Sequence, residues 1–195
     1  MRRGKTALGA QIAVTSARRG TGSAIFSLEM SRDELGARVL SNESRVPASR
    51  IRNPRWLRKE DWGALINLVS NLEECPFFVD DAPSLTIQAL TARARLYIRR
   101  HAVKLIVVDY LRLVQAPGRD LRERLGNATD ALRQLAKSEK VAVIALSQLR
   151  RPESINSRPS MLDLKESGDI EAHAHVVLLI YTPVESDSPT GWTKS

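Results

Sequence analysis

The stretch Val103-Lys-Leu-Ile-Val-Val-Asp109 decides the fold of this chain. Apolar, mostly β-branched residues fill positions 105–108 and a carboxylate closes the run, which is typical of a strand buried on both faces of a parallel sheet. Apolar residues recur at helical spacing before it, over Thr86–Arg100, and after it, over Leu121–Ser138. Helices that alternate with buried strands predict an α/β fold with a mostly parallel sheet.

Two further apolar runs also end in a polar residue. Ala24–Leu28 leads into Glu29, and Val141–Leu146 leads into Ser147 and Gln148. Ligands of parallel α/β sheets bind beyond the carboxyl ends of the strands. We therefore expect Glu29, Asp109 and Gln148 to lie along one rim of the sheet.

The remaining elements complete one domain over residues 1–195, because no linker divides the chain. Helices are expected at Lys5–Arg18, from a Ser31 cap to about Ser44, and at Lys59–Leu72. Short strands are expected at Cys75–Val79 and Val176–Tyr181. The basic segments Pro47–Arg58 and Arg112–Arg119 are expected to be irregular.

Gly4-Lys5-Thr6 directly precedes the first predicted helix. It matches the second half of the P-loop motif G-x-x-x-x-G-K-[ST], in which backbone N–H groups cradle phosphates, the lysine reaches the β- and γ-phosphates and the hydroxyl binds Mg²⁺. The first glycine of the motif would fall before Met1. A three-residue match alone is weak evidence, so the assignment of a phosphate site depends on the polar residues at the strand ends.

Those strand ends suit phosphoryl transfer. An aspartate after a buried strand, here Asp109, is a Walker-B candidate that holds Mg²⁺. Glu29 can orient or deprotonate an attacking water, and Gln148 can sense the γ-phosphate. Each has a plainer interpretation: Asp109 caps a helix or turn, Glu29 is a first-turn carboxylate that a helix dipole stabilises, and Gln148 is an ordinary polar strand end. Their joint occurrence with Gly4-Lys5-Thr6 favours the nucleotide site.

The amino-acid composition limits the kinds of partner, metal site and cellular location that the protein can have. The net charge is +8, from 30 Lys and Arg against 22 Asp and Glu, which fits either a nucleic-acid partner or a basic, well-solvated surface. Cys75 is the only cysteine, so no internal disulfide forms, and the pair His173 and His175 lacks partners for a metal site. No apolar run is long enough to span a membrane and no signal peptide is recognisable, so we expect a cytoplasmic protein.

Seven segments together resemble the C-terminal, RecA-like motor domain of DnaB-type replicative DNA helicases. They are GKT at 4–6, FSLEM at 26–30, PFFVDDAPSLT at 76–86, LIVVDYLRLV at 105–114, VIALSQLRR at 143–151, RPSMLDLKESGDIE at 158–171 and VVLLIY at 176–181. Their order and spacing agree along nearly the whole chain. The resemblance implies a RecA-like P-loop NTPase core that lacks the strand before the P-loop.

The resemblance also implies roles for individual residues. Gly4, Lys5, Thr6 and Asp109 would bind nucleotide, with Thr6 and Asp109 holding Mg²⁺. Glu29 would polarise the catalytic water, and Gln148 would couple the state of the nucleotide to the DNA-binding loops. The segment Lys165, Glu166, Ser167 and Gly168 would contact the backbone of single-stranded DNA, although the family usually carries arginine at the position of Lys165.

The function implied is ATP hydrolysis at the subunit interfaces of a homo-hexameric ring, which translocates on single-stranded DNA and unwinds duplex. Primase and a helicase loader are partners of full-length family members, and the replisome is the expected location. Because the chain reads as a domain truncated at both ends, we expect weak ATP hydrolysis or none from the chain alone. Two alternatives stay open: an impaired fragment that binds DNA or joins a ring or a complementing fragment, and a RecA- or RadA-like recombination ATPase.

Overall fold

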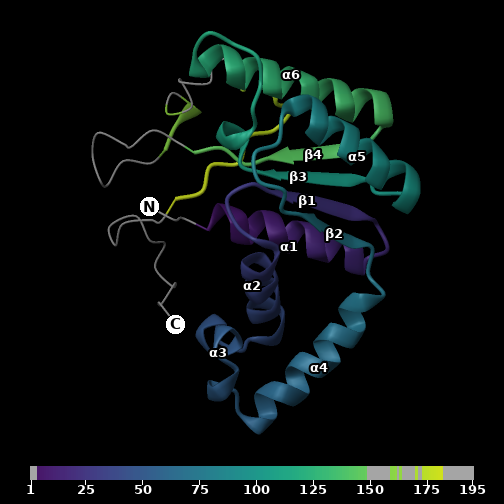
Figure 1. Ribbon diagram of the computed structural model, residues 1–195, viewed down its shortest axis with the longest axis vertical. Helices are drawn as coiled ribbons and strands as arrows, with labels where there is room; N and C mark the ends of the chain where they lie inside the picture. Colours follow the sequence, from purple (N-terminus) through teal and green to yellow (C-terminus); the bar gives the residue numbers. More distant parts are fainter. Residues whose placement is uncertain (1–3, 149–158, 162, 164–169, 171–172, 182–195) are drawn as a thin grey trace, which may run out of the picture.

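A four-stranded parallel sheet forms the centre of the protein (Figure 1). The computed structural model describes residues 4–148, 159–161, 163, 170 and 173–181. The strands lie in the order β2-β1-β3-β4. Their bounds are Ser23–Ser27 for β1, Phe77–Asp80 for β2, Leu105–Asp109 for β3 and Ala142–Ala145 for β4. The predicted α/β class and the parallel sheet are confirmed.

The register of the sheet brings the carboxyl ends of the strands into step. Ser27 of β1 lies opposite Asp109 of β3, and Phe26 lies opposite Asp80, the last residue of β2. Ala145, which ends β4, pairs with Val108. The loops that follow all four strands therefore begin at one edge of the sheet.

Helices cover both faces of the sheet (Figure 1). On one face α1 (Lys5–Arg18) and α2 (Arg32–Ser44) pack on Ile25, Leu105 and Val107. On the other face α5 (Ile87–His101) and α6 (Leu121–Glu139) pack on Phe26, Ile106 and Val108. Consecutive residues of a strand point to opposite faces, so one apolar run supplies both cores.

Gly9 lets α1 lie close to the sheet. A Cβ atom at this position would come within 3.2 Å of Leu146 Cδ1 and 3.4 Å of Val107 Cγ1. The absence of a side chain at Gly9 therefore lets α1 lie close to β3 and to the segment that follows β4.

Two predictions about irregular segments need correction. Pro47–Arg58 contains the short helix α3 (Ala48–Arg52) and the 3₁₀ turn η1 (Pro54–Trp56), ahead of α4 (Lys59–Glu73). A second 3₁₀ turn, η2 (Leu111–Leu113), leads into the basic loop predicted from Arg112. Proline stands at the N-cap of α3 and at the first position of η1, where its fixed φ suits a helix start. Helices this short show no apolar periodicity, so the pattern missed them.

The strand predicted at Val176–Tyr181 was also wrong. These residues are described, but they join none of the four strands, and Val176 and Leu178 are 74% and 71% exposed. An apolar run becomes a strand only when a neighbouring strand offers its N–H and C=O groups, and composition does not reveal that neighbour. In the part of the chain that the structure describes, no helix has the length and apolar character to cross a membrane.

The core on the α5 side predicts a position-dependent effect within one helix. Leu90 is fully buried and Leu96 is 51% exposed. We expect Leu90→Ala to lower the free energy of unfolding by about 2–5 kcal/mol, because it removes transfer free energy and leaves a cavity. Leu96→Ala is the control, with an expected change within about 0.5 kcal/mol. Equal shifts in urea-induced unfolding would contradict this packing.

Candidate functional site

The first turn of α1 presents free backbone N–H groups and a lysine at the carboxyl edge of the sheet. Gly4 is the N-cap of α1, with φ +82°, a left-handed conformation that strains any residue with a Cβ atom. No side chain caps this helix start, and its first turn contains no acidic residue. The unpaired N–H groups and the helix dipole therefore leave an anion-binding position, with Lys5 and Thr6 beside it.

The end of β3 lies against this helix start. Asp109 is 2% exposed, and its backbone carbonyl accepts a hydrogen bond of 2.8 Å from Leu28 N–H in the loop after β1. That bond brings Glu29 to the same place. The charges of Asp109 and Glu29 both act on Lys5. Lys5, Glu29 and Asp109, which are distant in the sequence, thus meet at one edge, as expected for Glu29 and Asp109 from their positions after the strands and for Lys5 from its place in the P-loop match.

Burial dominates the electrostatics of Asp109. It raises the pKa of the Asp109 carboxyl, and the negative charge of Glu29 raises it further. A hydrogen bond from the Thr6 side chain and the positive charges of Lys5 and Arg38 oppose that rise. Burial also lowers the pKa of Lys5, against the influence of Asp109 and Glu29. The neighbours of Asp109 therefore offset only part of the rise in its pKa that burial causes.

One oxygen of that carboxylate has no protein partner. Among the described residues, Asp109 Oδ2 is the buried side-chain atom that lacks a hydrogen bond. A buried unpaired carboxylate oxygen is costly, and such groups in native proteins usually serve a ligand or ion. Thr6 and Asp109 together offer the hard oxygen ligands that Mg²⁺ prefers beside phosphates, so these residues fit a magnesium–nucleotide complex.

A larger protein-only metal cage is not part of this site. Within the described ranges, no group of three or more His, Cys, Asp or Glu residues is placed to hold a metal ion. Mg²⁺ that binds with a nucleotide needs only one or two protein ligands, because phosphates and waters fill the remaining positions. The pair of Thr6 and Asp109 is therefore sufficient on chemical grounds.

Sequence reasoning missed Arg38. It lies in α2, is half-buried, and its charge lowers the pKa of Asp109. It gives the edge a second cation besides Lys5. In the sequence, Arg38 stands out only by lying about two helical turns after the loop that carries Glu29. That position does not indicate that its side chain lies near β3.

Gln148 lies near this edge without contacting the central residues. It is exposed and follows the end of β4 by three residues. Its segment is anchored at Leu146, whose N–H donates to Val108 and whose carbonyl accepts from Leu111 N–H. The described residues show no hydrogen bond or ion pair of Gln148 with Lys5, Glu29 or Asp109. The predicted DNA-binding residues Lys165, Glu166, Ser167 and Gly168 lie outside the described residues.

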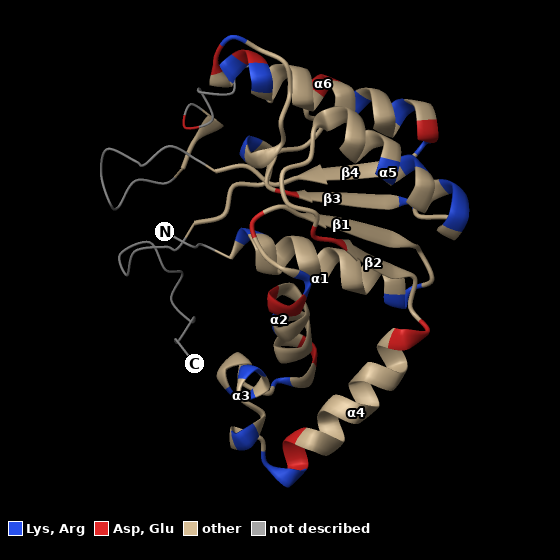
Figure 2. Ribbon diagram, viewed as in Figure 1, with Lys and Arg blue, Asp and Glu red and all other residues tan. Residues whose placement is uncertain are grey.

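The arrangement of charge supports one combined site. Figure 2 shows acidic residues at the carboxyl ends of β1, β2 and β3, beside the basic start of α1. An anion-binding helix start, a buried carboxylate with a free oxygen and an exposed carboxylate are the parts required to bind a triphosphate and activate water.

Comparison with known proteins gives a consistent family. The profile of the family described as DnaB-like helicase C terminal domain matches residues 2–193. A probable replicative DNA helicase of Trieres chinensis is 41% identical over 80% of this chain. The replicative DNA helicase DnaB of Mycobacterium intracellulare is 39% identical over 87% of it. These matches cover 35% and 30% of the two relatives, so the chain spans about a third of their length.

Solved structures agree with the sequence matches. One, described as an ATPase domain, aligns with 88% of this chain and 63% of its own, with a TM-score of 0.83 and 26% identity. A DnaB-like replicative helicase, described with its interactions with primase, aligns with 88% of this chain and 43% of its own, with a TM-score of 0.82 and 26% identity. The four-stranded sheet and its helices thus have the RecA-like fold expected from the sequence.

The buried carboxylate predicts that removing its charge stabilises the ligand-free protein. The pKa of the Asp109 carboxyl is raised in the folded state above the unfolded value of 3.8. The free energy of unfolding therefore falls as pH rises from the unfolded pKa through the folded pKa. We expect Asp109→Asn to raise the free energy of unfolding at pH 7 by about 0.5–2 kcal/mol, the range common for stabilising substitutions. The difference should shrink as pH falls towards 4. Urea titrations at several pH values measure it, and a less stable variant at pH 7 would contradict the electrostatic account.

Proposed function

This chain belongs to the DnaB-like helicase C terminal domain family, and from that membership we propose that it is the ATP-hydrolysing motor domain of a replicative DNA helicase. One observation carries the proposal beyond family likeness: Lys5 and Glu29 meet the buried Asp109 at one edge, where no described residue hydrogen-bonds to Asp109 Oδ2. The substrates are ATP and DNA, and Mg²⁺ is the cofactor. The location expected for such a protein is the cytoplasm, at the replisome.

Each residue of the edge has a task in ATP hydrolysis. The N–H groups of the first turn of α1 and the Lys5 ammonium bind and orient the phosphates, which is most of the catalysis in phosphoryl transfer. Thr6 and Asp109 would hold Mg²⁺, which when bound would supply positive charge beside the phosphate oxygens. The exposed Glu29 carboxylate accepts the proton of the attacking water.

Coupling to DNA is assigned from the sequence. Gln148 follows β4 at the rim where the phosphates would bind, which supports a role in sensing the γ-phosphate. The segment Lys165, Glu166, Ser167 and Gly168 suits contact with phosphates without reading bases, because its composition offers backbone N–H groups, a glycine and one cation. A homo-hexameric ring, single-stranded DNA, primase and a loader complete the proposed assembly.

The recombination ATPase has less support than the helicase. The relatives described above are replicative helicases, and none is described as a recombinase. An unwinding assay beside a strand-exchange assay separates the two. The alternative of an impaired fragment predicts binding to DNA or to a ring without ATP hydrolysis. The ATP assays below distinguish it from an active motor domain.

The proposed nucleotide site predicts ATP-dependent stabilisation that requires Lys5. Mg²⁺–ATP at about 100 times its Kd should stabilise the protein by about 2.7 kcal/mol. We expect Lys5→Ala to weaken ATP binding about 10- to 100-fold, the loss of a charged contact worth about 1.5–3 kcal/mol. Glu29→Gln should keep ATP binding and lower any hydrolysis by about 10²–10⁴-fold.

Lys104→Ala is the matched control, because Lys104 is an exposed lysine just before β3, at the opposite edge of the sheet. Thermal unfolding with and without Mg²⁺–ATP measures binding, and release of labelled phosphate with single-stranded DNA measures turnover. Equal ATP-dependent shifts in Lys5→Ala and Lys104→Ala would contradict the site.

The DNA contact predicts a change in salt dependence. Removing one cation from a phosphate contact should reduce the slope of log K against log salt by about 0.7 for single-stranded DNA. We therefore expect Lys165→Ala to bind single strands more weakly and with that shallower slope, whatever their sequence, and Lys165→Arg to retain both affinity and slope. Fluorescence anisotropy over a salt series measures this, and an unchanged slope for Lys165→Ala would contradict the assignment.

A further inference from the structure

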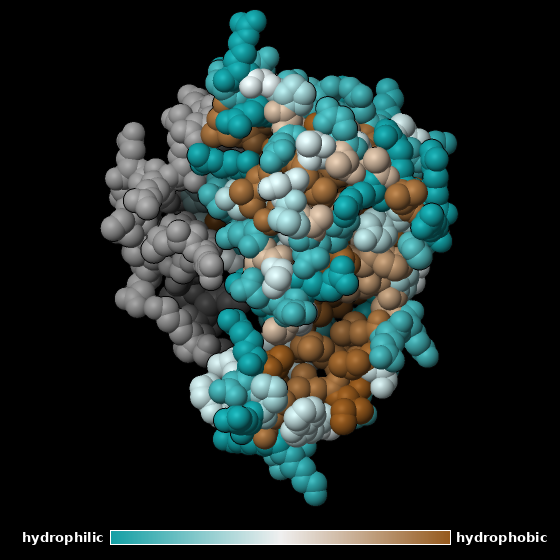
Figure 3. Space-filling view, in the orientation of Figure 1, coloured by the Kyte–Doolittle hydropathy of each residue, from teal (hydrophilic) through white to brown (hydrophobic). Residues whose placement is uncertain are grey.

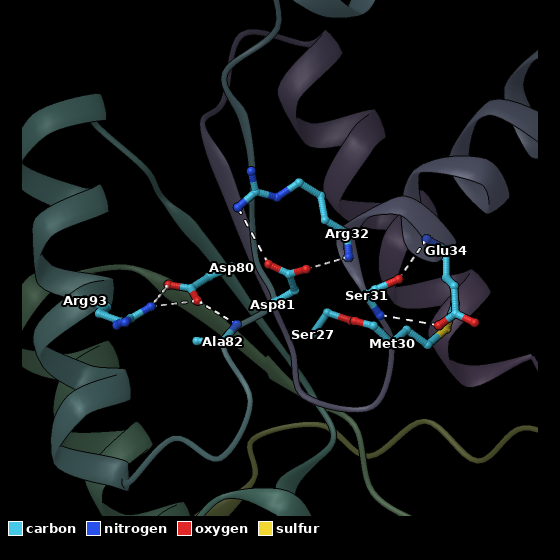
Figure 4. Close-up of polar contacts among 9 residues, drawn as sticks. All are labelled: Ser27, Met30, Ser31, Arg32, Glu34, Asp80, Asp81, Ala82 and Arg93. Carbon is cyan, nitrogen blue, oxygen red and sulfur yellow. Dashed lines mark hydrogen bonds and ion pairs between the residues drawn. The ribbon is translucent and has the colours of Figure 1, made fainter.

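Asp81 links the end of β2 to the start of α2. Its Oδ2 accepts a hydrogen bond of 2.8 Å from the backbone N–H of Arg32, the first residue of α2 (Figure 4). Its Oδ1 lies 3.6 Å from Arg32 Nη2. A helix leaves its first N–H groups without partners inside the helix. Asp81, from the turn after β2, takes one of these groups.

The backbone contact matters more than the ion pair. The side chains of Arg32 and Asp81 are 68% and 31% exposed, and an exposed pair at 3.6 Å contributes little. The bond to Arg32 N–H is shorter, is assisted by the carboxylate charge and places that charge at the positive end of the helix dipole. Asp81 therefore acts chiefly on the position of the backbone of α2.

A second acid holds the turn that carries Asp81. Both carboxylate oxygens of Asp80 lie 2.9 Å from Arg93 Nη1 on α5, and Oδ1 also accepts from Ala82 N–H at 3.2 Å (Figure 4). The Asp80 side chain is 8% exposed, so this pairing is well shielded on the acid's side. The end of β2 is thus fixed to the helix layer on the far face of the sheet, and Asp81 extends from a rigid support.

The loop between β1 and α2 carries Glu29 and is held at both ends. Before Glu29, Leu28 N–H donates to the Asp109 carbonyl. After it, Ser27 Oγ donates to the Met30 carbonyl at 2.7 Å, and Ser31 forms a capping box with Glu34. These last contacts stay within the β1–α2 unit. Among the side-chain contacts that the described residues make with this loop and helix start, Asp81 is the one that reaches across from β2.

We propose that Asp81 is a positioning residue for Glu29: it fixes the start of α2 to β2, and so sets where the Glu29 carboxylate lies above the end of β3. The role rests on the proposed function, because Glu29 must act on water at a bound triphosphate. Glu29 itself is exposed and its side chain forms no hydrogen bond with the described residues, so its backbone supplies its placement. Misplacing a catalytic group by about 1 Å can cost about 10²-fold in rate.

The test compares turnover of Asp81→Ala, Asp81→Asn and Asp33→Ala. Asp33→Ala is the matched control, because Asp33 is an exposed carboxylate in the same first turn of α2 and belongs to the helix itself. We expect Asp81→Ala to lower kcat for ATP about tenfold with KM nearly unchanged, since phosphate binding by α1 is untouched. Asp81→Asn should recover most of the rate, because its amide oxygen still accepts from Arg32 N–H. Asp33→Ala should match the unaltered protein.

Combination with Glu29→Gln separates positioning from a general structural effect. A residue that acts through Glu29 has no effect once Glu29 cannot accept a proton, so Asp81→Ala should not lower the residual rate of Glu29→Gln further. A further tenfold fall in the double variant would overturn the proposal. A rise in KM at constant kcat would also overturn it.

Amide hydrogen exchange gives a readout that needs no turnover. We expect Asp81→Ala to speed exchange at residues 28–32 several-fold while β3 and α6 keep their protection, and Asp33→Ala to leave all three unchanged. Unchanged exchange at 28–32 in Asp81→Ala would overturn the positioning role even if ATP binds without hydrolysis. Failure of the unaltered protein to bind ATP would instead overturn the proposed function, whereas turnover that depends on Glu29 but not on Asp81 would overturn only the positioning role.

Discussion

The structure depends on a buried carboxylate that its own surroundings do not fully satisfy. Asp109 ends the central strand β3, is almost completely buried and keeps one oxygen without a hydrogen bond from the described part of the chain. Burial opposes its ionisation, while Lys5, Arg38 and the Thr6 side chain favour it. Such a cost is typical of functional sites, where a ligand or ion can satisfy the unpaired group.

The parallel register is what makes such a site possible. β1, β2 and β3 end within a residue of one another, so the loops carrying Glu29 and Asp81 begin beside Asp109. The close packing of α1, allowed by Gly9, then brings the helix start with Lys5 to the same edge. Each contribution is local, and the sheet combines them.

The surface around α4 is partly apolar, unlike the charged carboxyl edge of the sheet. α4 carries large apolar side chains that remain exposed, among them Trp62 and Ile66, and Figure 3 shows an apolar area in the lower half of the molecule, where Figure 1 places α2, α3 and α4. Exposed apolar area of this kind typically marks contact with another protein surface. The sheet edge, by contrast, is built from charges that are held by hydrogen bonds, as at Asp80 and Asp81.

The sequence alone determined the fold class, the main helices, the four strands and three of the residues that meet at the edge. The apolar runs ending in Glu29 and Asp109, and the helix start at Gly4-Lys5-Thr6, predicted a parallel sheet and a common rim, because the alternation of buried strands and helices can be read along the chain. Only the tertiary structure decided that Val176–Tyr181 does not join the sheet, that Arg38 acts on Asp109 and that Asp81 holds α2. Strand pairing and the placement of cations beside a buried carboxylate depend on residues that are distant in sequence. The order of residues along the chain does not give the distances between them in the folded protein.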